Sequence, residues 1–427
     1  MGKDLGKLAR SISIIGVGCT PFRFMLDHPE TAGITDDELF AWAALEAMED
    51  AGIESKDIDA YILGYVTNST NSNKLNPNVS IGDWIGMRGK PSFHIESACA
   101  TPHIALDQAV MAVASGRYEV VLAGGVEMGQ SKVDGNKPAY MRRPMSREEL
   151  SAVISMALDP VYSQHMTDGN SYVFDNPTVN YGRKYHVTDE QLDDAFINSA
   201  ISLRRNAARD PLAFLQKEFK DVAKEAGFND VMAYMKSPHN PKVSYYERES
   251  AFVKNVEGAA AAIVCSTEMA KSFRQQPVEI LGTGFSVMDY RHAHNLEQAS
   301  QTALNQVYQI TGVKPKEIGL FQTTDFSMGE LLLTAEMAGY LPAGEGWRYL
   351  LEGQTAFDGD KPINTSGGHS SFGHAVGATL LADFGEVVKQ MRGQCGPRQV
   401  KKLPETTMVR GMGGSQHVLA TILRTVQ

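Results

Sequence analysis

Cys99 is the residue of this sequence that is best placed to act as a nucleophile. It follows a short predicted strand, 92–95, and precedes the helical pattern of residues 104–110, so it lies at a strand-to-helix turn. A thiol there faces the positive end of a helix and unpaired backbone N–H groups, which favour the thiolate. The alternative is a small buried apolar side chain, the more frequent role of a lone cysteine.

His374 belongs to a second stretch whose residues could take part in catalysis, the glycine-rich segment 364–379. Its glycines permit close approach of the backbone to a ligand, and His374 is predicted to open the helix that continues through residues 380–384. A cysteine beside a histidine forms a nucleophile and base pair, in which the imidazole takes the thiol proton. Backbone N–H groups would then stabilise the oxyanion of a thioester under attack.

The elements that must position these side chains alternate along the chain. Helical stretches at 37–51 and 104–114 alternate with apolar, β-branched runs that predict buried strands, which is typical of an α/β fold. The predicted strands cover residues 12–17, 60–66, 120–123 and 259–265.

An internal repeat divides the chain into two related halves. The segment 43–58 reappears at 303–318, at a constant offset of 260 residues. Each copy predicts a helix that ends at a glycine, followed by a charged turn and a strand. A second internal match pairs 120–125 with 408–414. A chance match is the alternative; with two related halves, a pseudo-twofold arrangement would bring Cys99 and its histidine partner together.

Composition excludes several classes of function. The 427 residues carry 50 acidic and 40 basic side chains, and the net charge of −10 disfavours nucleic-acid binding. No run of about 18 apolar residues is present and the first residues lack a signal sequence, so we expect a cytoplasmic protein without a membrane partner. The four cysteines form no C-x-x-C pair, and His292 and His294 lack a thiol or acidic partner in a clear pattern, so we expect no metal site.

The motifs resemble those of the thiolase superfamily, closest to its sterol-carrier-protein and archaeal types, over nearly the whole chain. The similarity rests on segments in the family's order, namely 96–101, 120–127, 256–261 and the specific G-G-x-x-x-x-G-H-x-x-G-A-T pattern at 367–379. The resemblance implies that Cys99 is the acyl-accepting nucleophile, that His374 is its activating base and that Gly413 is one of the catalytic positions. Ala375 and Leu380 replace the usual proline and final glycine of the last motif, changes that mainly adjust helix packing.

The resemblance also implies an architecture. It is the five-layered α-β-α-β-α thiolase fold, with two similar βαβαβαββ halves and an inserted loop domain. We expect the N-terminal half at 1–125 and 251–273, the insertion at 126–250 and the C-terminal half at 274–427. Family members act as homodimers or tetramers, and this branch often associates with a small OB-fold, zinc-ribbon accessory subunit. The resemblance implies no bound cofactor, with acyl-CoA and coenzyme A (CoA) as substrates.

Two departures concern the group that handles the proton on the carbon next to the thioester. Gly411 stands where many thiolases carry a second cysteine. The segment 323–326, Thr-Thr-Asp-Phe, replaces an H-D-C-F motif, so that its cysteine and its oxyanion-hole histidine are both absent. His369, His417 and Asp325 are the candidates to replace the cysteine, and a carboxyl group needs a pKa raised by burial for this role.

Charged pairs in the inserted region could meet the phosphates of CoA. Arg183 and Arg204, each with a basic neighbour, are the candidates, although such pairs are more often a solvated surface. Asn364 and Gly368 of the glycine-rich segment are the further candidates for substrate contact.

The sequence therefore predicts an acyl-CoA C-acyltransferase that cleaves a 3-oxoacyl-CoA with CoA through a cysteine-linked acyl-enzyme. Loss of the second cysteine favours a branched or aromatic substrate, as in aromatic degradation. One alternative is a thiolase-like retro-aldolase or condensing synthase, although the presence of Cys99 speaks against the aldolase. Another alternative is a non-catalytic acyl-CoA-binding scaffold.

Overall fold

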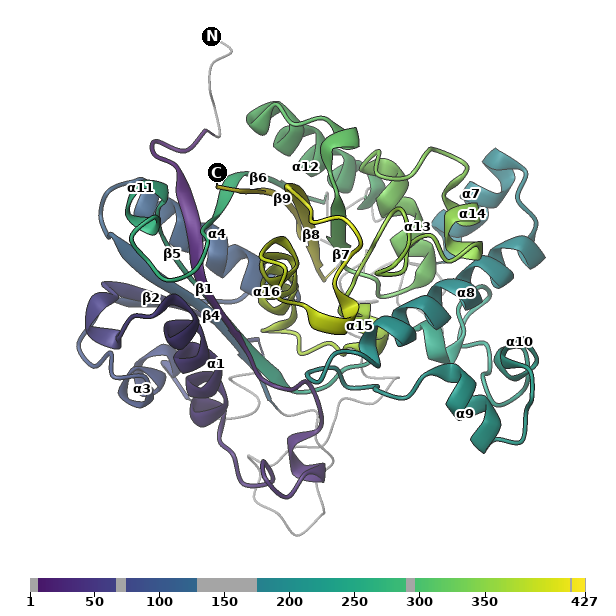
Figure 1. The fold of residues 1–427 in the computed structure, drawn as a ribbon, viewed down its shortest axis with the longest axis horizontal. Helices are drawn as coiled ribbons and strands as arrows, with labels where there is room; N and C mark the ends of the chain where they lie inside the picture. Colours follow the sequence, from purple (N-terminus) through teal and green to yellow (C-terminus); the bar gives the residue numbers. More distant parts are fainter. Residues whose placement is uncertain (1–6, 67–73, 129–174, 289–295, 415–416, 427) are drawn as a thin grey trace, which may run out of the picture.

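The computed structural model describes residues 7–66, 74–128, 175–288, 296–414 and 417–426. Their strands form one mixed nine-stranded sheet in the order β3-β2-β4-β5-β1-β6-β9-β8-β7 (Figure 1). The strands are β1 (Ile12–Cys19), β2 (Ala60–Gly64), β3 (Ser92–Ile95), β4 (Val120–Glu127), β5 (Gly258–Ser266), β6 (Val278–Val287), β7 (Leu320–Thr323), β8 (Thr406–Gly413) and β9 (His417–Thr425).

The strand order is the same in both halves when it is read outward from the centre of the sheet. β2 is parallel to β4 and β7 is parallel to β8, whereas β4–β5 and β8–β9 are antiparallel pairs. Beside β7, a parallel bridge between Phe321 and Ile363 takes the place that β3 has in the first half. A short pairing of β1 with β6, centred on Ser13 and Glu279, joins the halves. The prediction of two similar halves is confirmed.

Helices cover the sheet and fill the space between its halves. α1 (Asp36–Ala51) packs on β1 and β5, and α12 (Leu296–Thr311) packs on β6 and β9. α4 (Thr101–Ala114) and α16 (Thr379–Met391) contact each other in the centre, where α16 touches strands of both halves (Figure 1). The layers follow the predicted α-β-α-β-α order. The two sheets of that prediction are joined into one by the pairing of β1 with β6.

The repeat predicts equivalent helices, and the structure contains them. α1 is followed by Gly52 and α12 by Gly312, with φ angles of 72° and 71°. Glycine adopts this left-handed conformation at little cost, so it closes both helices. The strands that follow, β2 and β7, begin at Ala60 and Leu320 and keep the offset of the repeat.

The predicted match of 120–125 with 408–414 pairs the correct strands, but in the wrong register. β4 and β8 are equivalent, but the ladders make Val121 equivalent to Thr407, because these two residues face the first residues of β2 and β7. Gly124 then corresponds to Arg410. The Gly-Gly pairs that suggested the match are therefore displaced relative to each other.

The described part of the region predicted as inserted is helical and lies against the C-terminal half (Figure 1). The remaining α-helices are α3 (Pro77–Trp84), α7 (Asn176–Tyr185), α8 (Asp189–Ala207), α9 (Phe219–Glu225), α10 (Val231–Met235), α11 (Thr267–Ala270), α13 (Met328–Met337), α14 (Gly346–Leu351) and α15 (Gly368–Ser371). α8 contacts α14 and α15, and α7 contacts α13. β4 continues to Glu127, two residues into the region predicted as inserted. None of the described helices has the length and apolar character needed to span a membrane.

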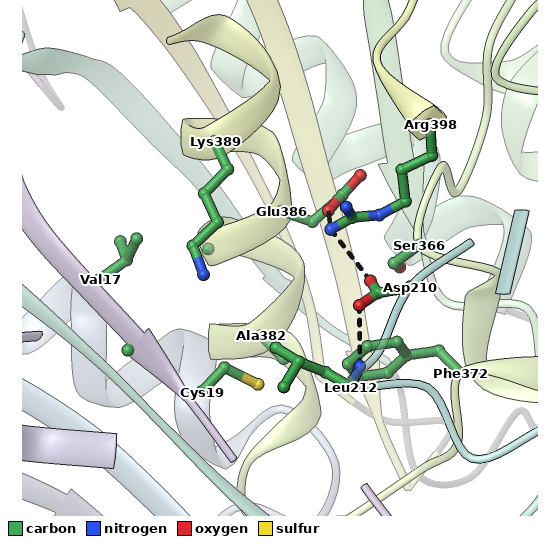
Figure 2. A pocket seen from close by; sticks show the side chains of 12 residues that line it. Val17, Cys19, Asp210, Leu212, Ser366, Phe372, Ala382, Glu386, Lys389 and Arg398 are labelled. Atoms are coloured by element: carbon green, nitrogen blue, oxygen red, sulfur yellow. Dashed lines mark hydrogen bonds and ion pairs between the residues drawn. The ribbon is translucent and has the colours of Figure 1, made fainter. Parts of the chain in front are cut away.

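A buried ion-pair cluster ties Asp210, within the region predicted as inserted, to α16 (Figure 2). Arg398 lies between Asp210 of the insertion, at 3.0 Å, and Glu386 of α16, at 2.6 Å. Asp210 also accepts a hydrogen bond from the backbone N–H of Leu212 at 3.0 Å. The cluster borders a cavity of about 20 Å³ that Cys19 also lines, and burial raises the pKa of Asp210 to about 6. The position of this segment therefore depends on buried charges.

Candidate active site

Cys99 lies in a tight turn between β3 and α4. β3 ends at Ile95 and α4 begins at Thr101, and Ala98 between them has a φ of 47°, in the left-handed region. The hydroxyl of Thr101 accepts a hydrogen bond from the backbone N–H of Ser97 at 2.6 Å. The backbone N–H of Thr101 donates to the carbonyl of Ala98 at 3.0 Å. Cys99 thus occupies the strand-to-helix turn that its flanking patterns predict.

His374 lies in an extended segment and not at the start of a helix. Its backbone N–H donates to the carbonyl of Lys254 at 2.7 Å, and its carbonyl accepts from the N–H of Val256 at 3.0 Å. α16 begins only at Thr379, so the prediction that His374 opens this helix is wrong. The reason is that the backbone of His374 pairs with a neighbouring segment and is not available for helical hydrogen bonds.

The structure brings Cys99 and His374 together across a sequence separation of 275 residues. Sγ of Cys99 lies 3.1 Å from Nε2 of His374. Each residue precedes the central helix of its own half, which is the arrangement that a pseudo-twofold relation of the halves predicts. A thiol and an imidazole at this distance can act as nucleophile and general base.

Burial favours the neutral form of both members of this pair. Burial raises the pKa of the Cys99 thiol to about 12; a hydrogen bond from the backbone N–H of Gly414 acts against this shift, and the carboxylate of Glu127 adds to it. Burial, and after it the neighbouring His369, lower the pKa of His374 well below its usual value. Backbone N–H groups thus act on the thiol in the predicted direction, but burial outweighs them.

The ring of His369 stacks on the ring of His374. Their centroids are 4.9 Å apart and their planes differ by 14°. Phe326 packs against both rings, with its centroid 5.1 Å from that of His374 and 5.6 Å from that of His369. Nε2 of His369 lies 3.0 Å from Oδ2 of Asp383, and both side chains are buried. His369 therefore contacts the candidate base and not the thiol.

Asp325 lies beneath the glycine-rich loop. It accepts hydrogen bonds from the backbone N–H of His369 at 2.7 Å and from the hydroxyl of Ser370 at 3.4 Å. A Cβ on Gly368 would collide with this carboxylate, so the glycine is required for the contact. Burial raises the pKa of Asp325 to about 7, while His369 acts against the shift. Asp325 thus meets the predicted pKa condition, but its described contacts link it to the loop and not to Cys99.

His417 and Gly413 lie beside the nucleophile turn. Nδ1 of His417 is 3.0 Å from the hydroxyl of Ser97. Gly413 pairs with His417 across β8 and β9, and a side chain at Gly413 would collide with the backbone of Ala100 and Ser97. The structure therefore brings His417 to the thiol side of the site, whereas Asp325 and His369 lie on the imidazole side.

Leu380 fills the space that a second cysteine would need at position 411. A Cβ on Gly411 would collide with Cδ1 of Leu380 and would lie 3.0 Å from Nδ1 of His103. Leu380 itself stands where the thiolase motif ends in a glycine. Leu380 therefore occupies the space that a side chain at position 411 would enter.

The structure places two of the predicted substrate contacts inside the fold. Arg204 is buried, with Nε 3.2 Å from the hydroxyl of Ser371 and its guanidinium 4.2 Å from the ring centroid of Phe219. Asn364 is buried as well, and its amide bonds both backbone groups of Thr323, at 2.8 and 2.9 Å. The described contacts of both side chains are therefore with the protein itself.

The other predicted contacts have different positions. Arg183 is exposed in the last turn of α7, and no described contact relates it to Cys99. Gly368 serves the contact with Asp325 described above. The pair His292 and His294 lies outside the described residues, and within those residues no group of three or more His, Cys, Asp and Glu is arranged to hold a metal ion.

A buried ion pair that sequence analysis missed supports the loop after β7. Nη1 of Arg410 lies 2.7 Å from Oε1 of Glu330, and Nη2 donates to the hydroxyl of Ser300 at 2.8 Å. Glu330 also accepts from the backbone N–H of Phe326, the residue that packs on His374. The signal for this pair was an arginine inside an apolar strand pattern. Asp383, an acid inside an apolar helix, was missed in the same way.

Comparison with known proteins agrees with this architecture. A family model described as the thiolase N-terminal domain matches residues 12–214, and one described as thiolase C-terminal domain-like matches residues 285–425. Acetyl-CoA acetyltransferase of Methanothermobacter thermautotrophicus is 29% identical over 96% of this chain and 98% of its own. Benzoylsuccinyl-CoA thiolase subunit BbsB of Thauera aromatica is 28% identical over 96% of each chain.

Solved structures share the fold at lower identity. The Ltp2-ChsH2(DUF35) aldolase has a TM-score of 0.73 at 20% identity and covers 97% of this chain and 98% of its own. Human mitochondrial 3-ketoacyl-CoA thiolase in complex with CoA has a TM-score of 0.67 at 16% identity over 99% of each chain. These likenesses show the fold, and the two family models together account for most of the sequence. The chain belongs to the thiolase family.

Proposed function

We propose that this chain is an acyl-CoA C-acyltransferase that cleaves a 3-oxoacyl-CoA with CoA through an acyl-enzyme on Cys99. The observation that carries the proposal is the 3.1 Å contact between Sγ of Cys99 and Nε2 of His374. Acyl transfer is also the activity named for the relative from Methanothermobacter thermautotrophicus.

The neutral state of the pair sets the order of the proposed proton transfers. Sγ of Cys99 attacks the 3-oxo carbon while the thiol proton moves to Nε2 of His374. The bond between C2 and C3 then breaks, which leaves a thioester on Cys99 and an enolate on the departing CoA ester. The imidazolium of His374 returns its proton to C2 of this enolate. Its low pKa makes it a strong donor, so the second cysteine is not needed.

The second half-reaction regenerates the thiol. The CoA thiol attacks the thioester carbonyl, and its proton moves to Nε2 of His374 as the sulfur–carbon bond to CoA forms. The bond to Cys99 breaks, and the departing sulfur takes the proton from His374. We assign oxyanion stabilisation to the backbone N–H groups of Cys99 and Gly414, which already act on the sulfur in the resting site. Gly413 contributes by letting β8 approach the turn.

The test is the intact mass of the protein after mixing with a panel of 3-oxoacyl-CoAs. We expect an adduct of the acyl mass on the wild type, no adduct on Cys99→Ala, and release of the adduct by free CoA. His239→Phe, which removes an exposed histidine of the insertion, is the matched control and should behave as the wild type. Absence of an adduct with every substrate would refute the proposal.

We propose a branched or aromatic acyl group as the substrate class. The support is the similarity to a protein named as a benzoylsuccinyl-CoA thiolase subunit and the absence of the second cysteine at Gly411. The test compares kcat/KM for aromatic, branched and linear 3-oxoacyl-CoAs of similar size. We expect a preference of at least about tenfold for aromatic or branched chains, which is about 1.4 kcal/mol. Equal values for linear chains would contradict it.

The assembly is also a proposal. We expect a homodimer or tetramer and an OB-fold, zinc-ribbon accessory subunit. One relative is named as a subunit, and the aldolase that shares the fold is named as Ltp2-ChsH2(DUF35), with a second component beside Ltp2. Light scattering of the purified chain measures its oligomeric state. Light scattering of material isolated from its native cells shows whether a companion polypeptide is bound. A monomer with no companion polypeptide in either preparation would contradict the proposal.

The second candidate function is a thiolase-like retro-aldolase or condensing synthase. The observation that favours it is the filled space at Gly411, because the site lacks a second cysteine there to handle the α-carbon proton. An aldolase would cleave its substrate without a covalent adduct and would keep its activity in Cys99→Ala. A non-catalytic acyl-CoA-binding scaffold would bind acyl-CoA and show neither an adduct nor turnover.

A further inference from the structure

The imidazole of His374 has a hydrogen-bond partner on only one of its two nitrogens. Nε2 faces Cys99, whereas Nδ1 is buried and has no partner among the described residues. A carboxylate or carbonyl on the second nitrogen commonly orients a histidine that acts as a base. In this site, the plane of the ring must be held by other contacts.

Two rings hold His374 in place. His369 stacks on it almost in parallel, at a centroid distance of 4.9 Å and an angle of 14°. Phe326 packs on it at 5.1 Å and 63°. Ring pairs at these separations attract each other, so a rotation of His374 away from Cys99 would lose both contacts.

His369, unlike His374, has a carboxylate as the partner of its Nε2. Its Nε2 lies 3.0 Å from Oδ2 of Asp383, and the other oxygen of Asp383 accepts from the amide of Gln322 at 2.8 Å. Asp325 accepts from the backbone N–H of His369 at 2.7 Å. Burial by itself lowers the pKa of His369, but Asp383 and then Asp325 outweigh it, so the pKa of His369 is raised.

The other charged groups that act on this pair of rings have partners of their own. Glu330 of α13 is paired with Arg410 at 2.7 Å, and Glu127 of β4 accepts from the backbone N–H of Gly377 at 3.1 Å. Within the described part of the chain, His369 with its carboxylate partner is therefore the titratable side chain that stacks directly on His374.

We propose that His369 is the positioning residue of His374: Asp383 holds His369 as an imidazolium, which fixes the plane of the His374 ring and keeps its Nε2 unprotonated until Cys99 delivers a proton. The inference rests on the proposed role of His374 as the base. A ring needed only for packing would not require a carboxylate, and a buried carboxylate costs desolvation energy. The pair of His369 and Asp383 therefore points to a role for the charge.

The experiment measures the rate of Cys99 alkylation by iodoacetamide between pH 4 and pH 9, followed by intact mass. His369→Phe keeps a ring and removes the charge, Asp383→Asn keeps a hydrogen-bonding group and removes the carboxylate, and His369→Ala removes both ring and charge. Loss of the positive charge raises the pKa of His374, so the acid limb of the rate profile should move to higher pH by about one unit in all three variants. In His369→Ala the plateau rate should also fall, on the order of tenfold.

Alkylation needs no CoA ester, so its outcome is independent of the acyl-enzyme test above. The inference is overturned if the acid limb of the rate profile stays at the wild-type pH in His369→Phe and Asp383→Asn while both variants keep native circular dichroism. If these variants do not fold, the ring ¹⁵N shifts of histidine-labelled wild type decide instead. At pH 7 they should report an imidazolium for His369 and a neutral ring for His374, and a neutral His369 overturns the inference equally.

Discussion

The two halves fill the same position of their sheets in opposite ways. In the first half, Gly124 of β4 leaves room for the ring of Phe40 from α1, with which a Cβ on the glycine would collide. In the second half, the equivalent strand residue is Arg410, and the helix residue at the repeat offset is Ser300. The hydroxyl of Ser300 accepts from Arg410 at 2.8 Å. Volume is conserved between the halves, but only the second half buries a charge here.

This difference places a buried ion pair of the second half beside the site. A buried arginine needs a partner, and Glu330 provides it while also holding the backbone of Phe326 next to His374. The first half contributes Cys99 from a turn that is closed by hydrogen bonds within itself. The shared topology brings the halves together, and burial, with the neighbouring His369 after it, lowers the pKa of the His374 imidazole.

The largest effect is expected from removal of the imidazole. In His374→Ala, alkylation of Cys99 at pH 7 should fall by about 10²–10⁴-fold, because a thiol with a pKa of about 12 loses its proton acceptor. The measurement is the second-order rate with iodoacetamide, and the thermal unfolding midpoint serves as the control for folding. A rate close to that of the wild type in a folded variant would show that the second half does not activate the thiol.

The next effect concerns the buried charge itself. Arg410→Met should lower the free energy of unfolding by about 3–5 kcal/mol, because Glu330 is left buried without its partner. The apolar counterpart, Phe40→Leu, should cost about 1–2 kcal/mol. Urea unfolding measures both losses, and adding Glu330→Gln to Arg410→Met should recover part of the first. Equal losses at Arg410 and Phe40 would remove the distinction drawn between the halves.

A smaller effect tests the coupled change at positions 380 and 411. Gly411→Cys should destabilise the protein by about 1–3 kcal/mol, because the new side chain overlaps Leu380. Leu380→Ala alone should also destabilise, by leaving a cavity. The double variant should lose less than the sum of the two, since the thiol then occupies that cavity. Additive losses in urea unfolding would mean that the two residues do not share one space.

The smallest effect concerns the cluster that ties the insertion to the central helix. Asp210 has a pKa of about 6 in the folded protein against 3.8 for an ordinary aspartate, and burial is the main cause. Its protonation therefore favours the folded state: this contribution is complete below about pH 4 and is lost as the pH rises through 6. Relative to Asp210→Asn, the wild type should lose about 2 kcal/mol of unfolding free energy between pH 4.5 and pH 7.5. A constant difference would mean that Asp210 is ionised throughout.

Much of the scaffold could be predicted from local patterns. The predicted strand 92–95 is β3, the helix predicted at 37–51 is α1, and the repeat appears as α1 and α12. Hydrophobic periodicity and the glycines that follow helices are patterns of a few neighbouring residues, so they predict these elements without knowledge of the tertiary structure. The register of β4 against β8 could not be predicted in the same way, because the ladder partners decide it and not the glycines.

The site was predictable only in part. Cys99 and His374 were marked by their flanking motifs, but His374 does not open α16, and the buried side chains of Arg204 and Asn364 are bonded inside the fold. Asp383, like Arg410, is a charge within an apolar segment, and the partner of such a charge is known only once the segments are packed.

By itself, the sequence determined two related α/β halves and placed Cys99 and His374 ahead of their central helices, because periodicity, glycine positions and motif spacing are properties of short segments. Only the tertiary structure decided that burial shifts the pKa values of both members of the pair, that His369 stacks on His374 and that Leu380 fills the space beside Gly411. These features depend on burial and on contacts between residues far apart in the chain, which no local pattern specifies.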